Sequence, residues 1–188
     1  MISIENISFS YGEKKVLEGY SLEIGKDSRI CIFGESGCGK TTLLRLILGL
    51  EKPQGGVIKK DGALHPSAVF QENRLLPFKT VLQNITLIGA DEKTALYHLK
   101  ALGLETAADS LPAQLSGGMQ RRAAIARALS ADYDYLVLDE PFTGLDEDNT
   151  LSAARHISQS VSDRALILVT HSKKEAQLLG AKTVDIKC

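Results

Sequence analysis

The stretch CIFGESGCGKTT, residues 31–42, places glycine, lysine and threonine at a spacing that suits a triphosphate. Gly34, Gly39, Lys40 and Thr41 fit the pattern G-x-x-x-x-G-K-[ST], with an apolar run before it and a helical pattern after it. In that context the glycines let the backbone wrap around phosphates with its N–H groups pointing inward. We expect Lys40 to reach the β- and γ-phosphates and the Thr41 hydroxyl to bind Mg²⁺.

This segment, residues 34–42, is called the phosphate loop below. Its predicted nucleotide-binding residues are Gly34, Glu35, Ser36, Gly37, Cys38, Gly39, Lys40, Thr41 and Thr42. Cys38 is expected to be a small residue that fits the loop, not a redox centre, and Cys31 a core residue of the strand before it. The alternative for the whole segment is a glycine-rich turn before a core helix.

Two carboxylates, Asp139 and Glu140, follow the apolar run YLVL at residues 135–138. Buried carboxylates are costly unless something pairs with them, and a metal ion is a good partner. Asp139 is therefore predicted to hold Mg²⁺, directly or through water. Glu140 is predicted to polarise a water in line with the γ-phosphate. The alternative is a solvated strand end.

A second anion site is indicated by Ser116, Gly117 and Gly118, which open a helical stretch that runs to about residue 129. Glycine costs a helix roughly 1 kcal/mol relative to alanine. A Ser-Gly-Gly opening, however, exposes N–H groups at the positive end of the helix dipole, which suits an anion. Because the phosphate loop already offers one such site, the question is which phosphate this second site binds.

The elements that must position these residues follow an α/β pattern. Residues 2–11 and 14–24 alternate and predict two antiparallel strands. The apolar run at 28–34 is consistent with a buried strand, and those at 135–140 and 165–171 are typical of strands buried on both faces of a parallel sheet. Helical patterns cover residues 40–50, 80–130, 146–160 and 172–179, with short strands near 55–62 and 67–71 and a last strand near 182–187. We expect a mainly parallel sheet, an N-terminal antiparallel β-subdomain and an inserted helical subdomain at about 80–130, in one domain spanning 1–188.

Composition narrows the function classes. The formal net charge of −1 gives no electrostatic case for binding nucleic acid, and no apolar run reaches the length needed to span a bilayer. The first fifteen residues do not resemble a signal peptide, and three cysteines suit a reduced, cytoplasmic protein better than a disulfide scaffold.

The motifs resemble those of the ATP-binding subunit of ABC transporters, in order and rough spacing across the whole chain. GESGCGKT is similar to its Walker A motif, LSGGM (115–119) to its signature motif and LVLDEP to its Walker B motif. TGLD (143–146) resembles its D-loop. The resemblance implies that Gln71 senses the γ-phosphate and Mg²⁺, that His171 contacts the γ-phosphate, and that Tyr11 stacks on adenine.

The resemblance also answers the question of the second anion site. It implies that two cassettes pack head to tail and that each LSGG motif binds the γ-phosphate held by the other. The implied partners are a second copy of the cassette, an integral-membrane permease and a substrate-binding protein, with no nucleic acid. The implied location is the cytoplasm, peripheral on the inner face of the cell membrane. VFQENRLLPFKTVLQNI, residues 69–85, also resembles the nitrate, sulfonate and taurine importer branch.

Three departures from the family pattern are visible. The signature motif ends in Met119, and the helical subdomain is short. The chain runs only about seventeen residues past His171, so we expect no C-terminal regulatory domain. One alternative is a non-transport ABC ATPase, for which we would expect a basic face or a coiled-coil insertion. A second is a P-loop small-molecule kinase, which would leave the LSGG and TGLD motifs unexplained. A third is a nucleotide-binding scaffold that does not hydrolyse ATP.

Overall fold

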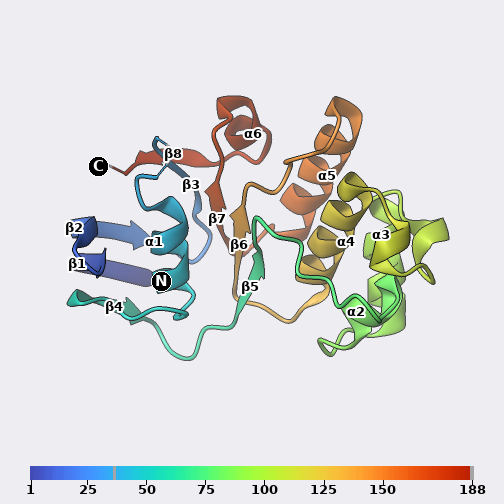
Figure 1. Cartoon of the computed structure of the whole chain (residues 1–188), viewed down its shortest axis with the longest axis horizontal. Helices are drawn as coiled ribbons and strands as arrows, with labels where there is room; N and C mark the ends of the chain where they lie inside the picture. Colours follow the sequence, from blue (N-terminus) through green and yellow to red (C-terminus); the bar gives the residue numbers. More distant parts are fainter. Residues whose placement is uncertain (36, 187–188) are drawn as a thin grey trace.

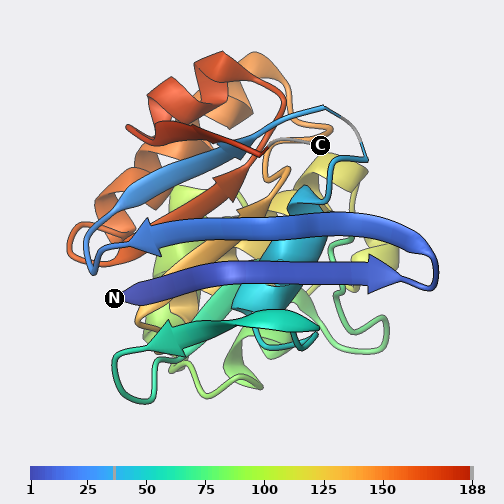
Figure 2. The ribbon, with the colours of Figure 1, turned by 90° about the vertical axis from the view of Figure 1, so that its left-hand side faces the viewer.

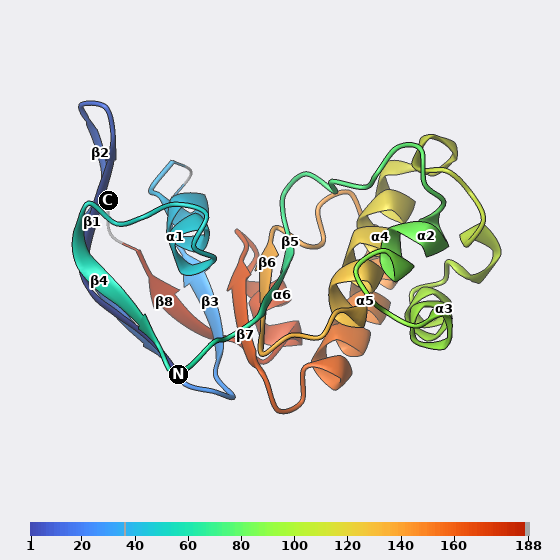
Figure 3. The same ribbon diagram turned by 90° about the horizontal axis from the view of Figure 1, so that it is seen from below.

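A computed structural model describes residues 1–35 and 37–186. Figure 3 shows its layers edge on: a three-stranded sheet, the helix α1, a five-stranded sheet, and then the remaining helices. The predicted fold class, an α/β core with a parallel sheet and an antiparallel β-subdomain, is confirmed.

The antiparallel sheet has the order β2-β1-β4 and consists of β1 (Ile2–Tyr11), β2 (Lys14–Ile24) and β4 (Gly55–Lys60). The second sheet has the order β5-β6-β7-β3-β8 and consists of β3 (Arg29–Phe33), β5 (Pro66–Val69), β6 (Tyr135–Asp139), β7 (Ala165–Val169) and β8 (Lys182–Asp185). The α-helices are α1 (Lys40–Ile47), α2 (Val81–Thr86), α3 (Glu92–Ala101), α4 (Gly117–Ser130), α5 (Glu147–Ser160) and α6 (Lys173–Leu178). Two short 3-10 helices, η1 (Glu105–Ala107) and η2 (Pro112–Gln114), precede α4.

Two hydrophobic cores lie on opposite faces of the parallel sheet. Successive residues of a strand point to opposite faces, so Tyr135 and Val137 of β6 join the core around α1, while Leu136 and Leu138 join the core beneath the other helices. Figure 2 shows β1 and β2 lying as a long hairpin across α1. The helix α1, which follows the phosphate loop, is therefore packed on two sides.

One edge of the parallel sheet collects the residues that could do chemistry. All five strands run in the same direction, so their carboxyl ends meet at one edge. At that edge β3 leads into the phosphate loop, β5 leads to Gln71, β6 ends in Asp139 and β7 leads to His171. Ligands of open α/β sheets bind outside this edge.

The helices α2, α3 and α4 lie between β5 and β6 in the chain and form the far side of the molecule (Figure 1). Ser116 is the N-cap of α4, because its hydroxyl accepts a hydrogen bond from the Met119 N–H at 3.2 Å. Across residues 1–35 and 37–186, none of the helices combines the length and apolar character that crossing a membrane requires.

A histidine pair that no sequence pattern predicts joins α3 to α5. His98 Nδ1 lies 2.8 Å from His156 Nε2, and both side chains are buried beside the Tyr97 ring. Burial, and then the neighbouring His156, lowers the pKa of His98 from 6.5 to about 4. Burial also lowers the pKa of His156. The pair is therefore neutral at pH 7.

We expect the free energy of unfolding to fall as the pH falls from about 6.5, the usual histidine pKa, toward 4. In that window the unfolded chain binds protons that the buried imidazoles do not accept. The double variant His98→Leu/His156→Leu should lose part of this slope, measured by urea unfolding at several pH values. His65→Leu removes an exposed histidine and should keep the wild-type slope. Equal slopes for the double variant and the wild type would contradict this.

Candidate nucleotide-binding site

A cavity of about 300 Å³ opens at the carboxyl edge of the parallel sheet. It brings together six predicted site residues from four segments of the chain: Lys40, Thr41, Gln71, Asp139, Glu140 and His171. Gly37, Gly39 and Thr42 complete the part of the wall that the phosphate loop contributes. Ser36 lies outside the described residues.

The backbone of the phosphate loop requires glycine at its turn into α1. Gly39 is the N-cap of α1 with φ +92°, a conformation that other residues rarely adopt. A Cβ atom at this position would also lie 2.8 Å from Val16 Cγ1 of β2. The β-hairpin therefore packs closely against one side of the loop at Gly39.

The Lys40 side chain forms hydrogen bonds with the backbone of the phosphate loop itself. Its ammonium donates hydrogen bonds to the carbonyl oxygens of Gly34 at 2.8 Å and Glu35 at 2.7 Å, and lies 4.0 Å from Cys38 Sγ. Gly34, Glu35 and Cys38 are not cavity-lining residues, so they contribute to the loop's shape and not to the wall. Cys31 and Cys38 are both buried, as expected for core and loop-packing residues.

Thr41 and Asp139 form the part of the site that could hold a metal ion. The Thr41 hydroxyl donates to Asp139 Oδ2 at 3.2 Å, and desolvation at the end of β6 raises the pKa of Asp139. The described residues contain no cluster of three or more His, Cys, Asp or Glu side chains suited to a metal. Mg²⁺, however, is usually bound through one or two carboxylates together with substrate phosphates, which fits one carboxylate and one hydroxyl beside a phosphate loop.

Glu140 and His171 face each other across the cavity. Glu140 has φ +49°, in the left-handed region that is uncommon for a residue with a side chain. His171 Nε2 lies 3.2 Å from Glu140 Oε1, yet this buried oxygen accepts no hydrogen bond within the described part of the chain. Desolvation raises the pKa of Glu140, while His171 acts in the opposite direction. Burial thus disfavours the charged carboxylate, and the nearby imidazole offsets part of this effect.

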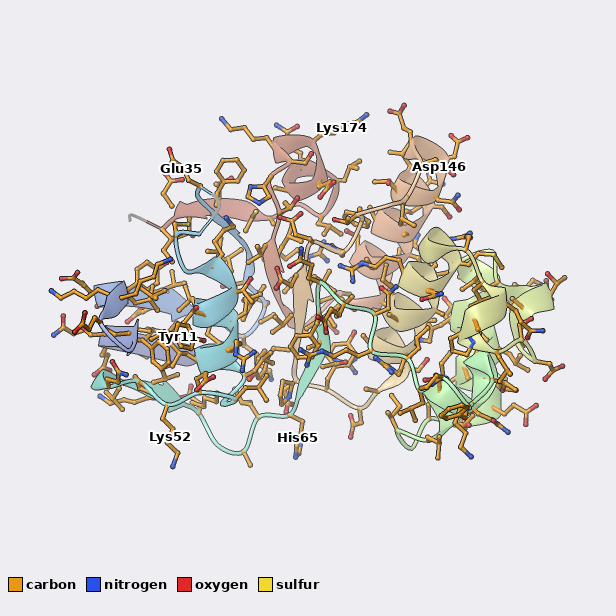
Figure 4. All side chains as sticks on the ribbon, viewed as in Figure 1. Tyr11, Glu35, Lys52, His65, Asp146 and Lys174 are labelled. Atoms are coloured by element: carbon orange, nitrogen blue, oxygen red, sulfur yellow. The ribbon has the colours of Figure 1, made fainter. Side chains whose placement is uncertain are left out.

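Ser116, Gly117 and Gly118 do not join this cavity. They line a second hollow of about 520 Å³ together with residues 143–146 and Gln71. Gln71 also lines the first cavity. Figure 4 shows Glu35 of the phosphate loop and Asp146 of the second hollow well apart along the long axis of the molecule. The two predicted anion sites are thus built on separate parts of one chain, linked through the segment around Gln71.

Tyr11 stands at the rim of the first cavity, near the tip of the β1–β2 hairpin. Its side chain is half exposed and meets the Phe9 ring edge on, with ring centroids 5.0 Å apart. Sequence reasoning missed Lys14 and Val16, which line the same rim. It also missed Arg121, a fully buried arginine of α4, since nothing in the local pattern distinguishes it from the neighbouring Arg122.

Comparisons with known proteins find relatives that match nearly the whole chain. The family model described as "ABC transporter" matches residues 17–143. The chain is 40% identical to the aliphatic sulfonates import ATP-binding protein SsuB 1 of Paraburkholderia xenovorans (strain LB400), over 99% of this chain and 57% of that protein. It is 37% identical to the ergothioneine transport ATP-binding protein EgtV of Helicobacter pylori (strain G27), over 100% of this chain and 97% of that protein. The chain thus spans less than two thirds of the length of the SsuB relative.

A solved structure gives the same result. The ATP-binding cassette MJ0796, in a dimeric post-hydrolysis state bound to ADP and Pi, superposes with a TM-score of 0.90. The superposition covers 100% of this chain and 94% of that one, at 28% identity. With its fold, its family model and two groups of relatives in agreement, the chain belongs to the ABC transporter family as an ATP-binding cassette.

Proposed function

We propose that residues 1–188 form a single ATPase cassette, with its helical subdomain at about 80–130, that hydrolyses ATP with Mg²⁺ as part of an importer. The catalytic residues are Lys40, Gln71, Glu140 and His171. The observation that carries the proposal is the separation of the phosphate loop from the Ser-Gly-Gly end of α4 into two cavities. One triphosphate needs only one such loop, so the second anion site serves a nucleotide held by another copy.

In this arrangement ATP joins two cassettes head to tail. Its γ-phosphate accepts hydrogen bonds from the phosphate loop of one copy and from Ser116, Gly117 and Gly118 of the other. Charge-assisted hydrogen bonds of this kind are stronger than neutral ones, and they exist only while the γ-phosphate is attached. Hydrolysis removes the bridge, and the pair of cassettes opens.

The reaction is attack of water on the γ-phosphorus, which releases ADP and inorganic phosphate. Glu140 accepts the proton of the attacking water through its carboxylate. His171 lies against that carboxylate and orients it toward the γ-phosphate. Lys40 leaves the carbonyl oxygens of its own loop and donates to phosphate oxygens, so its charge is supplied where negative charge develops.

Thr41, Gln71 and Asp139 are the residues that hold Mg²⁺ in this proposal. When bound, Mg²⁺ would supply positive charge that offsets the negative charge of the phosphates. Asp139 receives a hydrogen bond from Thr41 and feels the nearby charges of Arg121 and Lys40, all of which favour its ionised form. These contributions oppose desolvation and keep the carboxylate available as a ligand.

The membrane partner docks on the exposed apolar residues that follow β5. Phe78 is 89% exposed and Leu76 is 48% exposed, whereas Leu75 of the same segment is partly buried against the core. Exposed apolar side chains gathered in one segment often mark an interface. The cassette works on the cytoplasmic face of the membrane with a permease and a substrate-binding protein. The relatives' names give two different cargoes, aliphatic sulfonates and ergothioneine, so the cargo is chosen by those partners.

Lys40→Ala should abolish ATP hydrolysis, because the γ-phosphate loses the charge of the Lys40 ammonium. Phosphate release by the purified chain at saturating ATP measures this. Lys52→Ala removes an exposed lysine outside the cavity and should leave the rate unchanged. Turnover of Lys40→Ala at the wild-type rate would remove the assignment of the phosphate loop.

Tyr11→Ala should raise the KM for ATP while leaving kcat nearly unchanged. Stacking on adenine acts equally in the ground state and the transition state, so its loss weakens binding alone, by on the order of 1 kcal/mol. Steady-state kinetics measure both constants. Tyr11→Phe keeps the ring and should restore the wild-type KM. A large loss of kcat at constant KM would contradict the stacking role.

Glu140→Gln should separate binding from hydrolysis, because the amide cannot accept a proton from water. ATP then persists in both sites, and the chain should elute as a dimer with ATP and as a monomer without nucleotide. Size-exclusion chromatography with light scattering, repeated over a range of protein concentrations, measures this.

Ser116→Arg in the same chain should prevent the dimer while ATP binding by each monomer survives. The arginine places bulk where the other copy's γ-phosphate docks, and it removes the hydroxyl that caps α4. A double variant that dimerises with ATP as readily as Glu140→Gln alone would show that the Ser-Gly-Gly end of α4 is not the second half of the site.

A further inference from the structure

Arg121 is an arginine whose charge is buried at the centre of the molecule. It lies in the second turn of α4, and only 2% of its surface is exposed. Among residues 1–35 and 37–186 no carboxylate oxygen lies within salt-bridge distance of its guanidinium. A buried charge is costly unless its donors are satisfied, so the partners that it does have must be held firmly in place.

On one side these partners are the backbone carbonyls at the end of β6. Arg121 Nε donates to the Pro141 carbonyl at 3.1 Å, and Nη2 donates to the carbonyls of Asp139, at 2.6 Å, and Glu140. Three consecutive peptide groups therefore turn toward one guanidinium. Glu140 is the residue with the left-handed backbone, and Arg121 binds its carbonyl directly.

On the other side the partners belong to the segment that follows β5. Nη1 of Arg121 donates to the carbonyls of Phe70 and Gln71, the latter at 3.2 Å, and to Asn73 Oδ1 at 3.3 Å. The five N–H groups of one arginine thus reach both loops that carry Gln71 and Glu140. The side chain itself comes from α4, whose first residues carry the second anion site.

We propose that Arg121 is a positioning residue, which holds the Glu140 carboxylate and Gln71 at a fixed place relative to the Ser-Gly-Gly end of α4. This inference rests on the proposed function. It assigns to a buried arginine the task of joining the half of the site that hydrolyses ATP to the half that meets the other copy. Planar, fixed donors suit this task better than the single ammonium of lysine.

Three variants test the inference in the purified full-length chain. Arg121→Gln keeps donors but loses the charge and the reach, Arg121→Lys keeps the charge, and Arg127→Gln is the matched control. Arg127 is also in α4 and also donates to backbone carbonyls, those of Asn73 and Arg74, and among the described residues it donates no hydrogen bond to the end of β6. Thermal unfolding of each variant sets an assay temperature at which all are folded.

Arg121→Gln should lower kcat by about 100-fold while the KM for ATP stays within about threefold, since a shift of Glu140 by about 1 Å costs that much in rate. Arg121→Lys should recover part of the loss, and Arg127→Gln should keep kcat. In single-turnover assays, adding Arg121→Gln to Glu140→Gln should slow the reaction less than twofold further, because the two changes remove the same contribution. Multiplied losses, or a KM that rises as much as kcat falls, would overturn the proposal.

Amide hydrogen exchange without nucleotide gives a second readout that does not depend on hydrolysis. Peptides covering residues 69–74 and 138–144 should exchange at least about tenfold faster in Arg121→Gln than in Arg127→Gln. Equal exchange in the two variants would overturn the proposal even if the wild-type chain hydrolyses ATP. A wild-type chain that does not hydrolyse ATP would refute the proposed function, and the exchange data would still decide the role of Arg121.

Discussion

Buried charge at the carboxyl edge of the parallel sheet is the constraint on which the rest of the structure depends. Lys40, Arg121 and Asp139 are each less than a tenth exposed, and none of them forms an ion pair within the described chain. Removing charges from water is expensive unless hydrogen bonds replace those to solvent. Backbone carbonyls supply most of these hydrogen bonds, so the loops take the shape that their buried cations require. The shape of the loops around the first cavity thus follows from the need to hydrogen-bond these buried charges.

The same constraint links the helices α2 to α4 to the loops at the carboxyl edge of the parallel sheet. The helices α2 to α4 pack mainly among themselves and on the outer face of the sheet. Near the site, α4 is tied to the loops by hydrogen bonds from Arg121 and Arg127 to backbone carbonyls. Carbonyl oxygens have fixed directions, so each such bond restricts where the helix can lie relative to the loops. Apolar packing alone, which is non-directional, would restrict it less.

The features that could be predicted from the sequence are those that lie within one contiguous segment. The phosphate loop, the pair Asp139 and Glu140 and the Ser116 cap lie within single segments, and their spacing follows from the geometry of a strand, a loop and a helix. The parallel sheet was also predictable, because its strands are apolar on both faces. Partners far apart in the chain were not. No local pattern signals that Arg121 meets residues 70–73 and 139–141, or that His98 meets His156, since these contacts exist only once the tertiary fold has formed.

The positions of the hydrogen bonds that tie the helices α2 to α4 to the rest of the chain determine how bound ATP would act on these helices. At one end Arg121 binds the loops that surround the first cavity, and at the other end the neutral pair His98 and His156 joins α3 to α5. A change in the phosphate-binding loops therefore acts on α4 at its first turns, close to Ser116, and not at its far end. Because a helix is stiff along its axis, a small displacement at these turns carries the whole Ser-Gly-Gly end with it. In the proposed head-to-tail pair, such a displacement would move the surface around Ser116 that meets the second copy.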